Sequence, residues 1–274
     1  MDIRIIALDL DGTTMDSRNH LSKYNRKALE QAIRKGVTVV VASGRVFSAL
    51  PKEILEIEGL RYAISSNGAH ITDLSTGETL FRSLIRPEAV REAVRISREY
   101  GYPMEAFRHG KAYIDAGMYE AIVVHGRLNR NREYIMKTRK PLEDIFGFME
   151  SHDDQLENIN FFFETPDQLE TARPLIEAIP NATITSSVAN NLEVGGVNTS
   201  KAQAVQWLMD HLGLTREQLM ACGDARNDIP MIRLAGIGVA MGNAWDEVKE
   251  VADYVTDTNN DDGVGKAICR FVLD

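Results

Sequence analysis

The sequence has few residues of the kinds that several common protein classes require. Only two of its 274 residues are cysteines, Cys222 and Cys269, and they form no Cys-x-x-Cys pair. This excludes a disulfide framework and a thiolate zinc site. The six histidines show neither His-x-His nor His-x-x-x-His spacing, so a histidine metal site has no support. No apolar run approaches the roughly 18–20 residues that cross a bilayer, and no signal peptide precedes Asp9, so we expect a cytoplasmic protein.

Positive charge is also scarce. The chain has 31 Lys and Arg against 40 Asp and Glu, which gives a formal net charge of −9. Nucleic acids and anionic membranes are bound mainly through Lys and Arg, so we expect neither as a partner. A small phosphorylated metabolite remains compatible with the composition, because one site needs only local positive charge or a metal ion. The sequence carries no sign of the oligomeric state.

Short apolar runs alternate with helical patterns at both ends of the chain. Residues 3–8, 37–42 and 62–65 are predicted strands, and helices are expected after Ser22 and near 48–56. The same alternation returns in the last third, with a helix after Ser200 and strands near 219–222 and 238–241. This order predicts an α/β fold, a Rossmann-like doubly wound parallel sheet with helices on its faces.

The middle of the chain has a different pattern, with helices followed by paired strands. Helices are predicted at 87–100 and 166–178, and strands near 103–107, 112–114, 158–164, 182–187 and 191–194. We therefore predict a core domain of residues 1–83 and 193–274, and an inserted α+β domain of residues 84–192. The basic residues of segment 127–140 are interpreted as a solvated face, and the alternative is a patch that contacts the substrate.

Asp9 and Asp11 directly follow the first predicted strand. Residues two apart on an extended segment point to the same side, so both carboxylates can face the pocket outside the strand ends. Two close carboxylates repel each other, and Mg²⁺ can neutralise them while it holds a substrate phosphate. One Asp can then be a nucleophile, and the other a general acid and base. The alternative is an ordinary turn with Gly12 at a positive φ.

A second acidic cluster follows the predicted strand at 219–222. Asp224, Asn227 and Asp228 offer the oxygen ligands that a hard cation such as Mg²⁺ prefers. The alternative is structural, with Asp228 as a helix cap and Asp224 in a turn.

Two further segments could bind an anion. Ser43-Gly44-Arg45 follows the second strand, and a hydroxyl with free backbone N–H groups near a helix start suits a phosphate. Taken alone, this segment is better explained as a plain strand–helix turn. Lys201 lies in the first turn of its predicted helix, where a cation opposes the helix dipole. This local misfit suggests a role for Lys201 with phosphate and Asp9, and the alternative is a solvated lysine.

These segments together resemble the four motifs of the haloacid dehalogenase (HAD) superfamily in order and spacing. The motifs are Asp9-x-Asp11-Gly12-Thr13, Ser43-Gly44-Arg45, Lys201, and Gly223-Asp224-x-x-Asn227-Asp228. Residues 66–69, 238–244 and 260–264 are also similar to the Cof-like hydrolases of that superfamily. Those proteins carry a type IIB α/β cap after the third core strand. The resemblance therefore implies a HAD-like core with a cap at 84–192 that determines substrate specificity.

The resemblance also implies roles for individual residues. Asp9 would be the nucleophile that forms an aspartyl-phosphate, and Asp11 the acid and then base. Mg²⁺ would be held by the Asp9 and Asp224 side chains and the Asp11 carbonyl, with Asn227 and Asp228 supporting the metal. The phosphate and substrate site would contain Gly12, Ser43, Gly44, Arg45, Asn67 and Lys201.

The implied reaction is hydrolysis of small phosphorylated metabolites, such as sugar phosphates. A phosphomutase of the same fold is the alternative, because it would use the same two aspartates and return the phosphoryl group to the substrate. Unrelated classes fit less well. A dinucleotide-binding protein needs Gly-x-Gly-x-x-Gly after the first strand, and a Walker ATPase needs a Gly-Lys-Ser/Thr loop. A receiver module of signalling proteins is much shorter, and a non-catalytic relative would be expected to have lost acidic groups.

Overall fold

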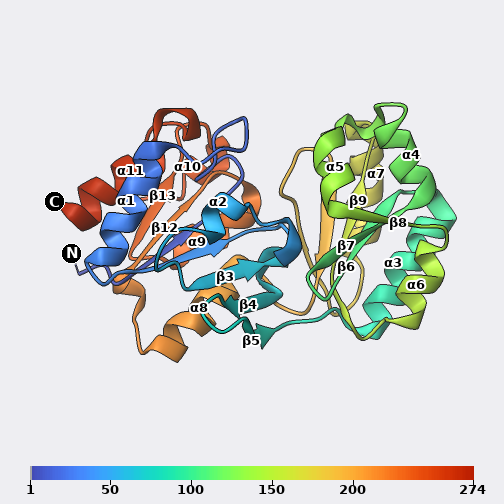
Figure 1. Cartoon of the computed structure of the whole chain (residues 1–274). Coiled ribbons are helices and arrows are strands. Elements are labelled where there is room, and N and C mark those ends of the chain that lie inside the picture. Colours follow the sequence, from blue (N-terminus) through green and yellow to red (C-terminus); the bar gives the residue numbers. More distant parts are fainter. Residues whose placement is uncertain (1) are drawn as a thin grey trace. The chain divides into compact units, whose positions relative to one another are not determined.

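The computed structural model describes residues 2–274, which form two compact units (Figure 1). Unit 1 comprises the residues up to Gly44, Leu50–Arg82 and Ser200–Asp274, and unit 2 comprises Arg45–Ala49 and Ser83–Thr199. The boundary expected at 193 falls seven residues early, because β11 (Asn191–Gly195) pairs with β9 (Leu156–Phe162) inside unit 2. Segment Arg45–Ala49 was expected in the core, but Val46 and Ala49 pack against Phe107 and Ala112 of unit 2.

Unit 1 is built on an eight-stranded sheet in the order β14-β13-β12-β1-β2-β3-β4-β5. The strands from β14 to β3 run parallel, whereas β4 and β5 are antiparallel additions that the sequence reasoning missed. The strands are β1 (Ile5–Leu8), β2 (Thr38–Ala42), β3 (Tyr62–Ser65), β4 (His70–Asp73), β5 (Glu78–Arg82), β12 (Leu219–Gly223), β13 (Ile237–Ala240) and β14 (Tyr254–Val255). The six parallel strands confirm the α/β prediction.

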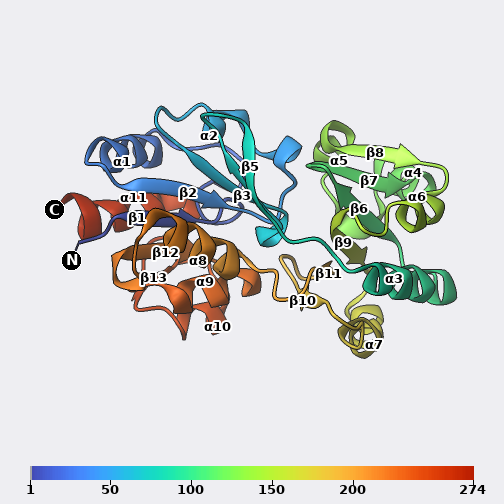
Figure 2. The ribbon, with the colours of Figure 1, turned by 90° about the horizontal axis from the view of Figure 1, so that it is seen from below.

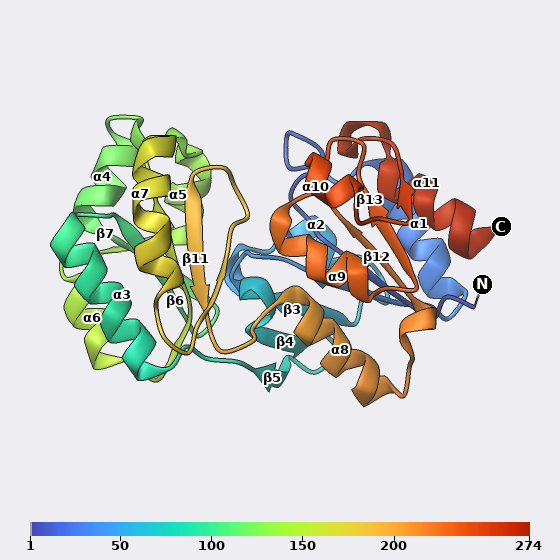
Figure 3. The same ribbon diagram turned by 180° about the vertical axis from the view of Figure 1, so that it is seen from behind.

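Helices pack on the faces of this sheet. Buried side chains of α8 and α9 pack against those of β1, β2 and β3, and Figure 3 shows both helices over the strands. Helices α1 and α11 contact each other, and α1 contacts β2. The helices of unit 1 are α1 (Lys23–Arg34), α2 (Lys52–Leu55), α8 (Lys201–Leu212), α9 (Ile229–Leu234), α10 (Asp246–Lys249) and α11 (Gly263–Ile268).

Local sequence signals explain where the main helices begin and end. The side chains of Ser22 and Ser200 accept hydrogen bonds from the N–H groups of Asn25 and Gln203 and cap α1 and α8, as the sequence predicts. Gly213 ends α8 in a left-handed conformation. The short helix predicted near 48–56 is confirmed only at 52–55, because Pro51 separates a 3₁₀ turn from the short α2.

Unit 2 contains a six-stranded mixed sheet in the order β10-β11-β9-β6-β7-β8. Its helices α3, α6 and α7 pack with β6, β9 and β11 around one apolar core that includes Phe161 and Phe163, and Figure 2 shows α3 and α7 on the same side of these strands. The remaining elements are α3 (Pro87–Tyr100), β6 (Met104–Arg108), β7 (Lys111–Asp115), α4 (Ala116–Val123), α5 (Arg132–Thr138), β8 (Arg139–Leu142), α6 (Ile145–Ser151), α7 (Pro166–Glu177) and β10 (Thr183–Thr185).

The basic segment 127–140 is not uniformly solvated, contrary to the sequence interpretation. Arg130 and Arg139 are nearly buried and form ion pairs of 2.8 and 3.1 Å with Glu105, which is fully buried. Burial raises the pKa of Glu105, but the charges of Arg139 and Arg130 outweigh it and hold the pKa below the ordinary value. Among residues 2–274, no helix is long and apolar enough to span a membrane.

Candidate active site

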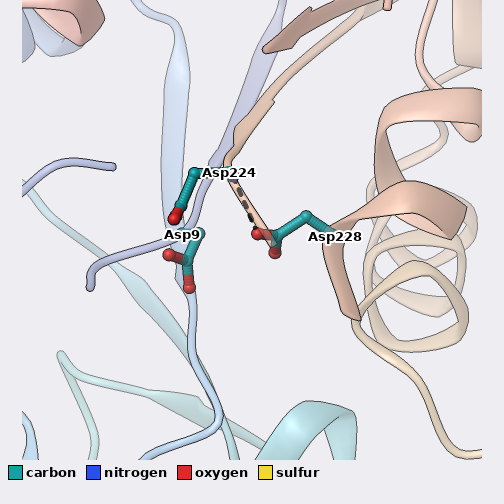
Figure 4. A group of neighbouring side chains, drawn as sticks. All are labelled: Asp9, Asp224 and Asp228. Atoms are coloured by element: carbon teal, nitrogen blue, oxygen red, sulfur yellow. Dashed lines mark hydrogen bonds between the residues drawn. The ribbon is translucent and has the colours of Figure 1, made fainter. Parts of the chain in front are cut away.

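Asp9 and Asp224 lie side by side because they follow neighbouring parallel strands. Leu8 of β1 is in register with Cys222 of β12, and the Asp9 N–H donates to the Cys222 carbonyl at 3.1 Å. Figure 4 shows the carboxylates of Asp9, Asp224 and Asp228 converging at these strand ends. One oxygen from each lies within 4.8 Å of the others.

Lys201 connects two of these carboxylates. Its Nζ donates to Asp9 Oδ1 and to Asp228 Oδ1, both at 2.6 Å, and its side chain is only 1% exposed. Burial lowers the pKa of Lys201, but the two carboxylates outweigh burial and raise the pKa above its ordinary value. The ammonium is therefore charged, and the alternative of a solvated lysine is wrong.

Asp228 is held on both sides of its carboxylate. Its Oδ2 accepts hydrogen bonds from the backbone N–H groups of Asp224 (3.0 Å) and Ala225 (3.1 Å), while Oδ1 accepts from Lys201. The side chain is fully buried at the start of α9. Asp228 thus fixes the loop that carries Asp224 and keeps few lone pairs for another partner.

Gly12 allows Asp224 to approach the first loop. Its φ is +77°, and a Cβ at this position would lie 2.5 Å from Asp224 Oδ2. Thr13 Oγ1 donates to Asp224 Oδ1 at 2.8 Å. The loop after β1 therefore orients the Asp224 carboxylate, and glycine is required for this close approach.

The site holds more negative charge than Lys201 can neutralise. Burial raises the pKa of Asp9 well above its ordinary value; Lys201 lowers it, and the charges of Asp228, Asp224 and Asp11 raise it again. Burial and the charge of Asp228 raise the pKa of Asp224 to about 6. The carboxylates of Asp9, Asp224 and Asp228 converge here, and Lys201 bonds to two of them, so a cation bound here would relieve both desolvation and repulsion. The donor set, carboxylate oxygens from two buried residues and one partly buried residue, fits a hard divalent metal.

Asp11 differs from Asp9 in its environment. Its side chain is exposed, whereas that of Asp9 is only 5% exposed, and residue 11 forms an isolated bridge with Met15. The charge of Asp11 still acts on Asp9 and Asp224, since it contributes to the raised pKa of each. The structure therefore places Asp11 near both carboxylates and within reach of water.

Ser43, Gly44 and Asn67 lie together in unit 1. Ser43 is fully buried after β2, and its carbonyl accepts from the Asn67 N–H at 3.0 Å. The Asn67 side chain packs on Gly44, because a Cβ there would lie 3.1 Å from Asn67 Oδ1. Asn227 Nδ2 donates to the same Oδ1 at 3.0 Å.

Arg45 follows Gly44 in the chain, and its described contacts are with other residues of unit 2. It belongs to unit 2, where it donates to the Ala49 carbonyl at 3.2 Å and lies 5.0 Å over the Tyr134 ring.

Sequence reasoning missed residues that support the loop after β1. Asn243 Nδ2 donates to the Gly12 carbonyl at 2.8 Å, and its Oδ1 accepts from the N–H of Asn259. Asn259 Nδ2 in turn donates to the Met15 carbonyl at 2.9 Å. No local pattern in the sequence predicts the contacts of Asn243 with Gly12 and of Asn259 with Met15, each of which joins residues more than 200 positions apart. Their only sign was the resemblance of residues 238–244.

Comparison with known proteins decides the family. The model of the haloacid dehalogenase-like hydrolases matches residues 6–268. The chain belongs to this family. A relative of this hydrolase is the 5-amino-6-(5-phospho-D-ribitylamino)uracil phosphatase YcsE of Bacillus subtilis, which is 35% identical over 100% of this chain and 97% of its own. Phosphatase YwpJ of the same organism is 32% identical over 96% of this chain and 97% of its own.

Solved structures agree with this assignment. A haloacid dehalogenase-like hydrolase from B. subtilis superposes with a TM-score of 0.86 at 28% identity, covering 98% of this chain and 100% of its own. The subclass IIB sugar phosphatase BT4131 superposes with a TM-score of 0.83 at 25% identity, covering 99% and 100%. This hydrolase is therefore a phosphatase of the HAD superfamily with a core sheet and a subclass IIB cap, and it acts on small phosphorylated metabolites.

Proposed function

We propose that the chain hydrolyses phosphomonoesters through an aspartyl-phosphate on Asp9, with Mg²⁺ as its cofactor. The observation that carries the proposal is the environment of Asp9. Within residues 2–274 the only hydrogen bond of its carboxylate is the one from Lys201 to Oδ1, so Oδ2 is left for attack on phosphorus. Lys201 fixes the orientation of this nucleophile. The arrangement differs from an ordinary structural salt bridge between one acid and one base, because Lys201 also bonds to Asp228, and Asp224 lies beside both acids.

In the first step Asp9 Oδ2 forms a bond to phosphorus as the bond from phosphorus to the leaving alcohol oxygen breaks. Asp11 supplies the proton for that oxygen, and its exposed side chain suits exchange with water. In the second step Asp11 takes a proton from water, whose oxygen displaces Asp9 from phosphorus and releases inorganic phosphate. Lys201 and Ser43 bind oxygens of the transferring phosphoryl group.

The Asp9 and Asp224 side chains and the Asp11 carbonyl would hold Mg²⁺, which when bound would neutralise these acids and the phosphoryl charge. Asp228 acts through its bonds to Lys201 and to the loop of Asp224. Asn227 supports the same loop through its bond to Asn67.

Turnover of p-nitrophenyl phosphate tests the reaction. We expect Asp9→Asn to abolish phosphate release with the melting temperature retained, and EDTA to stop the wild-type enzyme until Mg²⁺ is added back. Undiminished turnover in Asp9→Asn would refute the assignment of the nucleophile. Incubation with a hexose phosphate separates hydrolysis from the phosphomutase alternative, since a mutase would yield an isomerised sugar phosphate and no free phosphate.

For the substrate, we infer a phosphate carried on a sugar or sugar alcohol. The relatives YcsE, a 5-amino-6-(5-phospho-D-ribitylamino)uracil phosphatase, and BT4131, a sugar phosphatase, support this class. A polar face of the unit 2 sheet also supports it, because Asn160 and Glu193 occupy neighbouring register positions on β9 and β11 and are buried among further amides. Asn191 Nδ2 donates to Glu193 Oε1 at 2.8 Å, and Asn160 Nδ2 donates to Asn158 Oδ1 at 2.8 Å. Carboxylate and amide groups of this kind bind hydroxyls well.

A panel of sugar phosphates, 5-amino-6-(5-phospho-D-ribitylamino)uracil and flavin mononucleotide tests this inference. We expect kcat/KM to be highest for a polyhydroxyl substrate. Glu193→Gln should lower kcat/KM for the polyhydroxyl substrate about tenfold more than it lowers kcat/KM for p-nitrophenyl phosphate. A tenfold change corresponds to the loss of one hydrogen bond to a charged group. An equal effect on both substrates would contradict a role for Glu193 in recognising hydroxyls.

A further inference from the structure

We propose that the turn Ser66–Gly68 is a positioning element of the phosphoryl site, in which Asn67 and Gly68 set the places of Ser43 and Lys201. The inference rests on the proposed function for its kinetic test but not for its structural test. The turn follows β3 and lies wholly in unit 1.

The backbone of this turn adopts a conformation that its residues disfavour. Ser66, Asn67 and Gly68 have φ values of 51°, 54° and 99° in succession. Left-handed backbone is unfavourable for residues with a Cβ, and two such residues in a row persist only where surrounding contacts require them. Ser66 and Asn67 are also buried, so the conformation cannot be explained by the mobility of an exposed loop.

Asn67 joins two loops of the site. Its N–H donates to the Ser43 carbonyl, and its Oδ1 accepts from Asn227 Nδ2, each at 3.0 Å. The same oxygen lies against the backbone of Gly44. Asn67 therefore ties the end of β2 to the loop after β12, and the left-handed backbone is what allows one residue to reach both.

Gly68 meets the start of the helix that carries Lys201. A Cβ on Gly68 would lie 2.2 Å from the Ser200 carbonyl oxygen and 3.1 Å from the Lys201 backbone nitrogen. The first turn of α8 therefore packs directly on the turn. Any displacement of this contact moves the residue whose Nζ holds Asp9 and Asp228.

These contacts distinguish positioning from direct binding. The Asn67 groups described above point to the protein itself, so loss of its side chain should weaken the orientation of the transferring group more than the binding of substrate. A positioning role predicts a lower kcat with little change in KM, whereas substrate contact predicts a higher KM. A purely structural role predicts a lower melting temperature alone.

The experiment compares Asn67→Gly and Gly68→Ala with Asn181→Gly. Asn67→Gly keeps the left-handed backbone and removes only the side chain, and Asn181 is a left-handed asparagine (φ 54°) in unit 2 that serves as the matched control. Each protein is assayed with p-nitrophenyl phosphate well below its own melting temperature. We expect kcat to fall about tenfold in Asn67→Gly and on the order of 100-fold in Gly68→Ala, the size expected for small misplacements of catalytic groups. The kcat of Asn181→Gly should be unchanged.

A crystal structure of Gly68→Ala gives a readout that does not depend on activity. We expect at least one of the two 2.6 Å contacts of Lys201 Nζ to be lost or lengthened. If both contacts persist in Gly68→Ala, or if Asn67→Gly raises KM at unchanged kcat, the proposal is overturned. Wild-type protein without any phosphatase activity would instead refute the proposed function and leave the structural test to decide the positioning role.

Discussion

Asp224 is predicted to make the metal-free protein less stable at neutral pH. Its pKa is raised to about 6 by burial and by the charge of Asp228, whereas an unfolded chain returns it to its ordinary value near 3.8. Because the pKa of Asp224 is higher in the folded state than in the unfolded state, the free energy of unfolding is highest below about pH 4, where Asp224 is protonated in both states. It falls as the pH rises through about 6, where the buried carboxylate becomes charged. The difference between the two pKa values corresponds to about 3 kcal/mol, at about 1.36 kcal/mol per pKa unit.

Asp224→Asn removes this penalty and keeps an oxygen for the Thr13 hydroxyl, which donates to Asp224 Oδ1 at 2.8 Å. In EDTA at pH 7 we therefore expect the variant to have the higher free energy of unfolding, by about 1–3 kcal/mol. The gap should close as the pH falls toward 4. In Mg²⁺ the order should reverse, because a ligand that binds the folded state stabilises only the protein that retains its site. The variant should also lose phosphatase activity.

Urea unfolding followed by circular dichroism between pH 4 and pH 7, with and without Mg²⁺, measures these differences. Asp246→Asn is the matched control, since it also removes one negative charge from a side chain that is 97% exposed. A metal-free Asp224→Asn protein that is less stable than wild type at pH 7, or a difference that does not change with pH, would refute the reasoning.

Three further predictions follow from buried contacts. Lys201→Met leaves the Asp9 and Asp228 carboxylates buried without their cation, so we expect a loss of roughly 3–5 kcal/mol in urea unfolding and loss of turnover; a stable variant would contradict the ion pairing. Glu105→Gln leaves two buried arginines unpaired and should destabilise the protein by about 3 kcal/mol at pH 7. Because the Glu105 pKa is lowered, the difference in free energy of unfolding between wild type and Glu105→Gln should shrink as the pH falls below the ordinary value of 4.5. A difference that stays constant with pH would contradict the ion pairing of Glu105. Gly12→Ala should abolish Mg²⁺-dependent stabilisation in thermal melts, since its Cβ would meet the Asp224 carboxylate, and an unchanged Mg²⁺ response would contradict that contact.

The parallel core could be predicted because its signals are local. Apolar runs such as 37–42 form buried strands, and Ser22 and Ser200 cap helices through bonds to residues three positions away. The two antiparallel strands β4 and β5 were missed, because three of the four residues of β4 (His70–Asp73) are polar and three residues of β5 (Glu78–Arg82) are only partly buried.

The residues of the acidic site, and the proximity of Asp9 to Asp224, could be predicted, whereas contacts between distant side chains could not. Parallel strand ends bring Asp9 and Asp224 together, which the strand order implies. The burial of Arg130 and Arg139 could not be inferred, because it depends on Glu105, which lies more than 20 residues away on another strand. For the same reason, the contacts of Asn67 and Gly68 with distant loops appear only in three dimensions.

The central claim is that Asp9 becomes covalently phosphorylated during turnover. Rapid quenching of the wild-type enzyme with a radiolabelled phosphomonoester, followed by peptide mass spectrometry, measures this directly. We expect a transient acyl phosphate on Asp9 that disappears as inorganic phosphate is released and that does not form in Asp9→Asn. Phosphate release without any protein-bound phosphoryl group, or with the label on another residue, would contradict the account.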